Sequence, residues 1–191
     1  MWQDNQPDGY DYNKIGMRMQ VTSNIIKEKK KKEIQYKILT AVPVLLLMGV
    51  IFAFSAKTAT KSMEESDAVV DIVMGLAQEG KDAQPSDREK LYEMLVVIVR
   101  KGAHMAEYAV LCMLAALHLT TWKLPYRKLA ISSVLFAAFY AATDEFHQLF
   151  VEGRSGEVKD VLIDSAGAVL GILAFTIIRL LVLRYQRKKC Q

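Results

Sequence analysis

The chain has 191 residues, of which 52% are hydrophobic and 24% are charged, and its formal net charge is +4. The length fits a single domain, and the composition excludes a collagen-like repeat, a disulfide scaffold and disorder throughout. Two cysteines, Cys112 and Cys190, are too few for a disulfide framework. The Lys and Arg residues flank four apolar segments, so their excess predicts a membrane protein and no nucleic-acid partner.

The first 37 residues are polar and lysine-rich, with eight basic side chains. We interpret residues 1–37 as a cytoplasmic basic segment and expect residues 1–24 to be disordered. The first apolar segment, Ile38–Phe54, carries no charge in 17 residues. With Ser55 and Ala56 it approaches the ~20 residues that a bilayer span requires. Pro43 lies inside it, which membrane helices tolerate. A signal peptide is not expected, because this segment starts far from the N-terminus and lacks a small-residue cleavage site.

The polar region after the first span contains one amphipathic stretch. In Glu64–Gln78, five aliphatic residues alternate with acidic ones. This pattern fits either an amphipathic helix on the outer membrane surface or a loosely folded loop. The sequence Ser86-Asp-Arg-Glu89 predicts a capping box that opens the second membrane helix.

The three later apolar segments have short charge-free cores. Tyr108–Trp122, Leu129–Thr143 and Ser165–Ile178 contain 15, 15 and 14 residues. As helices they are about 21–23 Å long at 1.5 Å per residue, whereas the hydrocarbon core is about 30 Å thick. Each helix must therefore draw charged neighbours into the membrane.

The distribution of cations predicts the orientation. Residues 1–37, 120–128 and the tail from Arg179 together hold 16 of the 25 basic residues, while 56–92 holds five basic and eight acidic residues. Cation excess marks the cytoplasmic side. The predicted fold class is all-α, a four-transmembrane-helix bundle with both termini cytoplasmic. Its membrane domain covers 38–184, with spans at about 38–56, 94–119, 129–150 and 160–183, and 185–191 form a basic cytoplasmic tail.

This topology gathers polar residues at the outer ends of three helices. The second helix carries an i, i+3, i+7 pattern, and the third and fourth each carry an i, i+4 pair. The predicted site consists of Lys101, His104, Glu107 and Tyr108, then Asp144, Glu145 and Gln148, then Arg154, and finally Asp160 and Asp164. Ionisable groups at this depth are costly, so they indicate a functional site. We expect Arg154 and Lys101 to pair with the carboxylates.

Other polar residues near helix ends have a simpler interpretation. We interpret Arg100, Glu157 and Lys159 as interfacial anchors on the outer side, and His118 and Trp122 as anchors on the inner side. In the fourth helix, Gly167 and Gly171 form a G-x-x-x-G motif, which predicts close packing against a neighbouring helix.

At these residues the sequence resembles the VanZ-like family of membrane proteins. The resemblance rests on the spacing within four segments and covers roughly residues 38–175. The four segments are Lys101-x-x-His104-x-x-Glu107-Tyr108, Asp144-Glu145-x-x-Gln148-x-Phe150, Gly153-Arg154, and Asp160-x-x-x-Asp164-x-x-Gly167-x-x-x-Gly171. Phe52-x-Phe54-Ser55 and Ser62 resemble the end of the family's first span. Glu152 stands where the family usually has proline, and Asp164 where asparagine is common.

The resemblance implies a setting more than a mechanism. The founding member is associated with low-level resistance to teicoplanin, a lipoglycopeptide that binds the D-Ala-D-Ala end of cell-wall precursors. The implied location is the plasma membrane of a bacterium, Gram-positive by the same resemblance.

Two main functions remain open. The first is a binding protein whose polar site holds an envelope lipid, a cell-wall precursor or the drug and contributes to resistance. The second is a hydrolase or transferase of the envelope, with Glu107 or Glu145 as acid or base, His104 as proton shuttle, and Lys101 or Arg154 holding an anion. A purely structural role is a third. His104, Glu107, Asp144 and Glu145 are also of the types that bind a divalent metal in helical bundles, but no closed ligand motif is present. We therefore expect no cofactor, and membrane lipids as partners.

Overall fold

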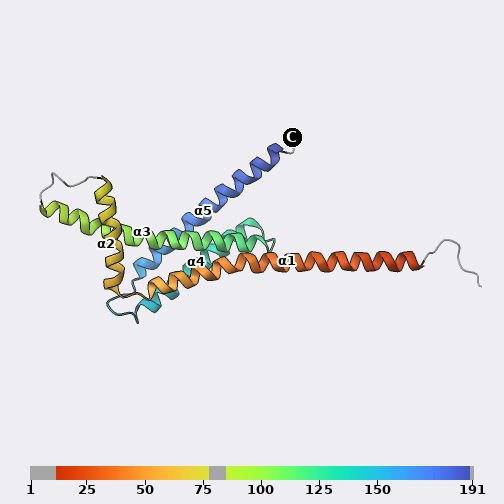
Figure 1. Cartoon of the computed structure of the whole chain (residues 1–191), viewed down its shortest axis with the longest axis horizontal. Helices are drawn as coiled ribbons and strands as arrows, with labels where there is room; N and C mark the ends of the chain where they lie inside the picture. The colour runs from red at the N-terminus through yellow and green to blue at the C-terminus, as the bar shows by residue number, and fades with distance from the viewer. Residues whose placement is uncertain (1–11, 78–84, 190–191) are drawn as a thin grey trace, which may run out of the picture. The chain divides into compact units, whose positions relative to one another are not determined.

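The computed structural model describes residues 12–77 and 85–189 and is all-helical over these ranges. Its helices are α1 (Tyr12–Ser55), α2 (Ala59–Ala77), α3 (Pro85–Thr120), α4 (Tyr126–Gln148) and α5 (Val158–Lys189) (Figure 1). The chain divides into two compact units, residues 1–39 and 40–191. The first contains the basic start of α1, and the second contains everything that positions the site.

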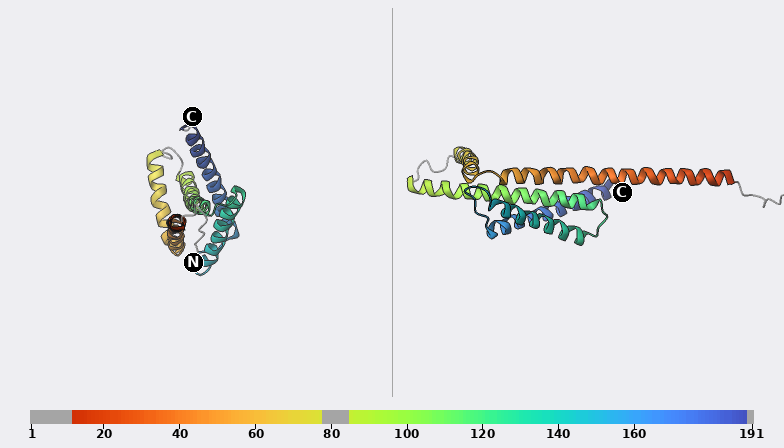
Figure 2. Two further views of the ribbon diagram at one scale, coloured as in Figure 1. Left: turned by 90° about the vertical axis from the view of Figure 1, so that its right-hand side faces the viewer. Right: turned by 90° about the horizontal axis from the view of Figure 1, so that it is seen from below.

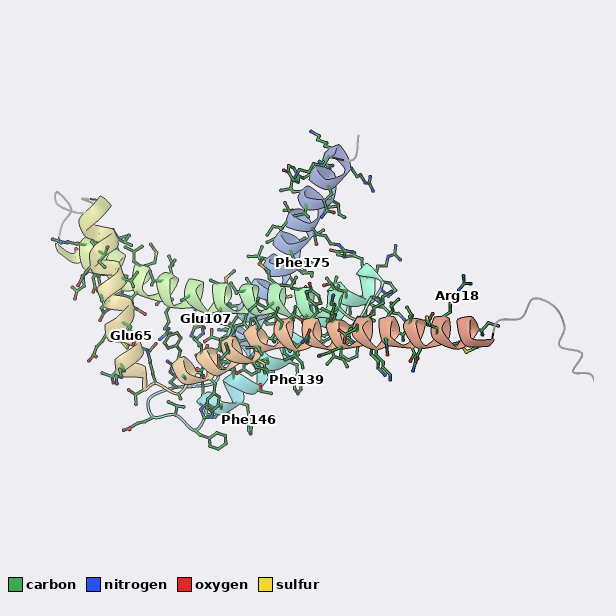
Figure 3. All side chains as sticks on the ribbon, turned by 45° about the vertical axis from the view of Figure 1, so that its right-hand side comes forward. Arg18, Glu65, Glu107, Phe139, Phe146 and Phe175 are labelled. Atoms are coloured by element: carbon green, nitrogen blue, oxygen red, sulfur yellow. The ribbon has the colours of Figure 1, made fainter. Side chains whose placement is uncertain are left out.

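Four helices, α1, α3, α4 and α5, are long and apolar enough to cross a membrane. Each predicted span overlaps one of them, and α1 continues through Pro43 as expected. Large apolar side chains such as Leu45, Leu46 and Phe139 are more than 60% exposed, and Phe139 and Phe146 lie on the outer side of α4 (Figure 3). Exposed apolar side chains on helices of this length are the expected surface towards lipid. The chain is therefore a multi-pass membrane protein.

The expectation of disorder over residues 1–24 was wrong for residues 12–24, which form the start of α1. Residues 1–11 lie outside the described residues. Residues 12–24 include Lys14, Met17, Arg18, Met19 and Gln20, which favour helix, and contain only one glycine. This segment also continues directly into an apolar helix, so no separate nucleation step is needed.

The amphipathic stretch after the first span is the helix α2, not a loop. The predicted end of this stretch, Gln78, lies outside the described residues. Helix α2 packs against α3, with Ser66 and Val70 buried, and the three views show it crossing α3 steeply (Figures 1 and 2). The next helix, α3, begins at Pro85, so Ser86 lies inside the helix and the prediction that it caps the helix was wrong. Proline is well suited to a first helical position, because its N–H is not needed there.

Helices α3, α4 and α5 pack closely on one another, and α3 and α5 form the most extensive contact. The predicted role of the G-x-x-x-G motif is confirmed. A Cβ atom at Gly167 would overlap the carbonyl oxygen of Met105, and one at Gly171 would overlap that of Ala109. Two glycines one turn apart therefore bring the α5 backbone directly against α3, as small residues do in membrane bundles.

Two apolar clusters hold the helices of the second unit together. One, centred on Cys112, Ala137 and Ala168, joins α3, α4 and α5. The other joins the 40–55 part of α1 to α3 and α4, through Val44, Ile51 and Tyr108 among others. The Tyr140 hydroxyl also donates to the Met48 carbonyl at 2.7 Å. The α1 segment thus relies on side-chain contacts and this hydrogen bond, whereas α5 adds close backbone contact with α3 to its side-chain packing.

Candidate functional site

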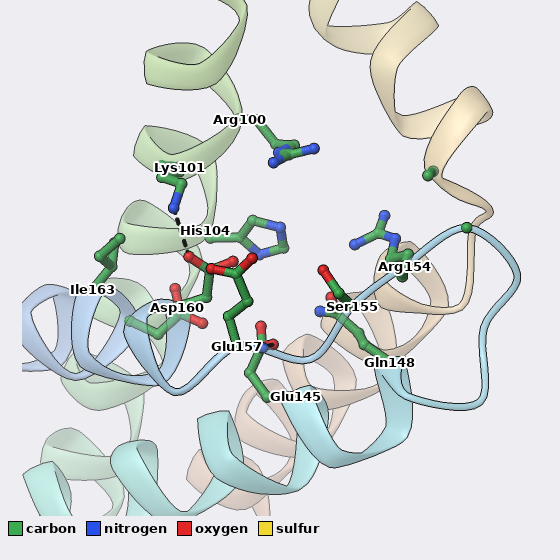
Figure 4. Close-up of a pocket in the computed structure, with 13 residues that line it drawn as sticks. Arg100, Lys101, His104, Glu145, Gln148, Arg154, Ser155, Glu157, Asp160 and Ile163 are labelled. Carbon is green, nitrogen blue, oxygen red and sulfur yellow. Dashed lines mark hydrogen bonds and ion pairs between the residues drawn. The ribbon is translucent and has the colours of Figure 1, made fainter.

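The polar residues of α3, α4 and α5 meet around one hollow, here called the polar cavity, of about 120 Å³. Helix α3 contributes the middle of its length, α4 its end, and α5 its start, and the loop 149–157 closes the space (Figure 4). Seven of the ten predicted site residues line it: Lys101, His104, Glu145, Gln148, Arg154, Asp160 and Asp164. Tertiary packing therefore brings together residues that are up to 63 positions apart in the sequence.

One expected ion pair is present in the polar cavity. The Lys101 Nζ lies 2.7 Å from Oδ1 of Asp160, drawn as a dashed line in Figure 4. Both side chains are about one-third exposed. The pair connects α3 to the first turn of α5 and offsets one carboxylate charge. Because the close approach of α3 and α5 at Gly167 lies two turns below, the ion pair follows from the same packing.

The loop holds Glu145 by its backbone. The Glu157 backbone N–H donates to Glu145 Oε2 at 3.0 Å. The loop can approach α4 this closely at Gly156, where a Cβ would stand only 2.5 Å from the Glu145 carbonyl oxygen. Gly153 adopts a φ of +74°, a left-handed conformation that glycine accommodates without strain. The two glycines explain how a short loop turns back over the carboxylate.

Glu107 faces a second hollow, the side cavity, of about 210 Å³. Its Oε2 is 3.7 Å from Nδ1 of His104, an ion-pair distance that is too long for a hydrogen bond. Residues of α1, α2, α3 and the loop line this cavity: Phe54, Ser62, Glu65, Ser66, Val69, Val99, Arg100, Ala103, His104, Glu107 and Arg154. Arg100, His104 and Arg154 line both cavities, so the two hollows share one wall.

The remaining two predicted residues, Tyr108 and Asp144, lie in neither lining set. Tyr108 is fully buried and Asp144 is 3% exposed. Gln148 Nε2 donates to Asp144 Oδ2 at 3.3 Å, and the Asp144 charge acts on both Glu107 and Tyr108. They form a buried layer behind the cavities.

Several buried atoms of this layer have no hydrogen-bond partner among the described residues: Ser55 Oγ, His104 Nδ1, Glu107 Oε2, Tyr108 Oη, Asp144 Oδ1 and His147 Nε2. Buried polar atoms are normally paired, with protein or with water. Six of them lie on α1, α3 and α4, so donors and acceptors available for bonding are concentrated here.

The expected pairing of Arg154 with a carboxylate is not found. Its Nε donates to the Lys57 carbonyl at 3.0 Å, and no carboxylate of the described residues lies within ion-pair distance of its guanidinium. The reason is geometric, because the loop runs past the end of α1 before it reaches α5. Burial lowers the pKa of Arg154 and the neighbouring charge of Arg100 lowers it further, while Asp144 and Glu145 act in the opposite direction.

Three residues with polar side chains line the polar cavity but were not in the predicted site. Arg100 and Glu157, interpreted as interfacial anchors, both line it, and so does Ser155. Lys159, interpreted in the same way, is exposed and lines neither cavity. The signal for Arg100 was present, because it stands four residues before His104 and so shares its helix face. Nothing in the sequence distinguishes Glu157 from Lys159.

The arrangement suits recognition of opposite charges. Arg100 and Arg154 supply positive charge and Glu157 supplies negative charge, while Asp160 is already offset by Lys101. His104, Glu145 and Asp164 add hydrogen-bonding groups to the same lining. Within the described ranges, no group of three or more His, Cys, Asp or Glu side chains is arranged to hold a metal ion. The site offers charge and hydrogen bonds.

Comparison with known proteins agrees with the spacing of these residues. The VanZ/LLP1 family matches residues 40–179, which is most of the chain and includes every residue of both cavities. No curated protein and no solved structure matches the chain. A match over this length establishes the relationship, and the chain belongs to the VanZ/LLP1 family.

Proposed function

We propose that this membrane protein acts in the bacterial cell envelope by binding a ligand with an anionic group in the polar cavity, and that this contributes to teicoplanin-type glycopeptide resistance. The ligand is an envelope lipid, a cell-wall precursor or the drug itself. The founding VanZ member's association with this resistance supplies the phenotype, and the cavity supplies the binding chemistry.

The observation that carries this proposal is a pair of arginines without a carboxylate partner. Neither Arg100 nor Arg154 forms an ion pair with any described residue, although several carboxylates line the same cavity. Their charges repel each other, so an anion bound between them would relieve an unfavourable interaction. Guanidinium groups bind phosphate and carboxylate through two parallel hydrogen bonds.

The proposed orientation places the polar cavity on the outer side. The connection between α3 and α4 and the end of α5 are rich in Lys and Arg, whereas the region around α2 is acidic. With the cation-rich side in the cytoplasm of a Gram-positive cell, both termini are inside, and the cavity faces the compartment in which teicoplanin and the exposed precursors lie.

Thiol labelling tests this orientation. Cys112 and Cys190 are replaced by alanine, and single cysteines are placed at Thr60, Glu152 or Tyr126, which are exposed residues in the described structure. An impermeant thiol reagent on intact cells should label Cys at 60 and 152 and not at 126. The reverse pattern would put the cavity on the cytoplasmic side and would remove the proposed access to the drug.

A matched pair of arginines on α3 tests the function. Arg100→Gln should return teicoplanin susceptibility to the level of cells without the protein, while Arg88→Gln, an exposed change near the start of the same helix, should not. Both are compared at equal amounts of protein in the membrane. Retained resistance in Arg100→Gln would contradict the proposal.

A second candidate function rests on the 3.7 Å approach of Glu107 to His104. A histidine beside a carboxylate, facing two cavities, has the composition of an acid–base pair, so a hydrolase or transferase acting on an envelope substrate uses the same site. Product formation from purified protein and envelope lipid extract, lost in His104→Gln, would favour this function over binding alone.

A further inference from the structure

The side cavity differs from the polar cavity in the kind of residue that lines it. Phe54, Val69, Val99 and Ala103 make much of its wall, together with polar groups of α2. Phe54 and Val69 are each 44% exposed, and Ile72 and Val73 continue the exposed apolar surface along α2. An apolar path thus leads from the shared wall at Arg100, His104 and Arg154 to the exterior of the protein.

The polar cavity itself is divided by charge. In Figure 4 the Arg154 guanidinium lies on the loop side, and the carboxyl groups of Glu157 and Asp160 lie across from it, towards α3 and α5. Asp160 is neutralised by Lys101, and Glu145 accepts the Glu157 backbone N–H. The carboxylates of Glu157 and Asp164 have no hydrogen-bond or ion-pair partner among the described residues, as is also true of Arg100.

We propose that the two cavities form one site for a lipid with a zwitterionic head group, an inference that rests on the proposed function. The head group carries a phosphodiester and a primary ammonium. The phosphodiester lies between Arg100 and Arg154, next to His104. The ammonium lies against Glu157 and Asp164. The hydrocarbon chain leaves through the side cavity, past Phe54 and Val69, to the lipid-facing surface.

The charges explain why neither a purely anionic lipid nor a quaternary ammonium lipid fits as well. An anion without an ammonium leaves the Glu157 carboxylate uncompensated in the same cavity. A quaternary ammonium has no N–H to donate to a carboxylate, and it is normally recognised by a cage of aromatic rings. Phe54 is the only aromatic residue in the two lining sets.

The experiment uses the full chain, purified in detergent and stripped of lipid, with native mass spectrometry to measure bound lipid. Phosphatidylethanolamine, phosphatidylglycerol and phosphatidylcholine with identical acyl chains compete at equal concentration. We expect phosphatidylethanolamine to be preferred about tenfold, the factor that corresponds to ~1.4 kcal/mol and to one charge-assisted hydrogen bond. Glycerophosphoethanolamine, the head group alone, should compete at least about tenfold more weakly than the lipid, because it leaves the side cavity empty.

Matched loop variants locate the ammonium. Glu157→Gln should reduce the preference to about twofold, since an amide cannot neutralise the ammonium. Glu152→Gln, an exposed change in the same loop outside both lining sets, should keep the full preference. Both positions are exposed, so neither change is expected to impair folding.

The outcomes separate this inference from the proposed function. Equal binding of the three lipids, preference for phosphatidylglycerol, or an undiminished preference in Glu157→Gln would overturn the zwitterionic ligand. Competition by the free head group as strong as by the lipid would overturn the role of the side cavity. Arg100→Gln should weaken all phosphate-bearing lipids alike, and wild-type binding in this variant would overturn the anion site on which the proposed function rests.

Discussion

The two ends of the α3–α4–α5 bundle contain similar residue types in different physical states. At the end where α3 gives way to α4, His118 Nδ1 is 3.0 Å from the Thr40 hydroxyl, and the Trp122 indole N–H donates to His118 Nε2 at 3.2 Å. Tyr126 and Thr176 share a hydrogen bond, and Arg179 stacks over the Tyr126 ring at 5.6 Å. The polar groups named there have partners and lie near the surface.

At the other end, polar groups are buried and several lack partners. Among the residues that the structure describes, His104 Nδ1, Tyr108 Oη and Asp144 Oδ1 have no hydrogen-bond partner. The difference shows that polar residues at a helix end do not by themselves indicate a site. Interfacial anchors are paired locally and exposed to water, whereas a binding site keeps buried groups available. The two histidines of α3 differ in this respect, because His118 has hydrogen-bond partners on both ring nitrogens and His104 Nδ1 has none among the described residues.

The largest effect on stability is expected from a change at the backbone contact between α3 and α5. Gly171→Leu should prevent close packing of α3 and α5, because even a Cβ overlaps the Ala109 carbonyl. We expect a melting temperature lowered by about 10 °C or loss of folded protein. Thermal unfolding in detergent measures it, with Gly49→Leu as control, since nothing lies within 4 Å of a Cβ there. Equal stability of the two variants would show that the close contact between α3 and α5 does not stabilise the bundle.

Arg154→Ala should reduce both folded yield and resistance. The change removes the hydrogen bond to the Lys57 carbonyl and a cation from an acidic site, which costs about 1–3 kcal/mol when a buried acceptor is left unpaired. Arg179→Ala at the opposite end should alter neither, because Arg179 is exposed and contacts only a ring face among the described residues. Fluorescence size-exclusion yield and teicoplanin susceptibility are the two measurements. The comparison fails if both arginines behave alike.

Glu145→Gln and Glu107→Gln should abolish resistance while leaving membrane expression near normal. Both substitutions keep the side-chain shape and remove a charge that faces a cavity. Glu64→Gln, an exposed change on α2, serves as the control and should be silent. Expression-normalised susceptibility of the three variants decides the matter. Full resistance in both cavity variants would mean that these carboxylates are structural.

The smallest effect is expected for His118. His118→Ala removes the bonds to Thr40 and Trp122 at a partly exposed position, so it should cost about 1 kcal/mol of stability and leave resistance unchanged. His104→Ala should instead abolish resistance at a similar cost in stability. Thermal unfolding and susceptibility of the two variants, measured side by side, would show whether the histidines differ in role as the structure indicates.

The sequence alone determined that the chain is helical and crosses the membrane, because hydropathy and helix length are local properties. It also indicated which faces of α3, α4 and α5 carry the polar residues, since the spacings i, i+3 and i+4 define a face without any tertiary information. For the same reason the G-x-x-x-G motif predicted a close helix contact. In the structure its two glycines lie against the backbone carbonyls of Met105 and Ala109 on α3. The orientation of the termini remains a prediction from charge.

Only the tertiary structure decided how the faces combine. Arg100 and Glu157 resemble interfacial anchors in sequence, and they line the cavity because α3 and the loop converge there. Arg154 was expected beside a carboxylate, but the path of the loop places it beside the end of α1, where a backbone carbonyl takes its Nε–H. Partner choice of this kind depends on distances between segments remote in sequence, and no local pattern of residues encodes those distances.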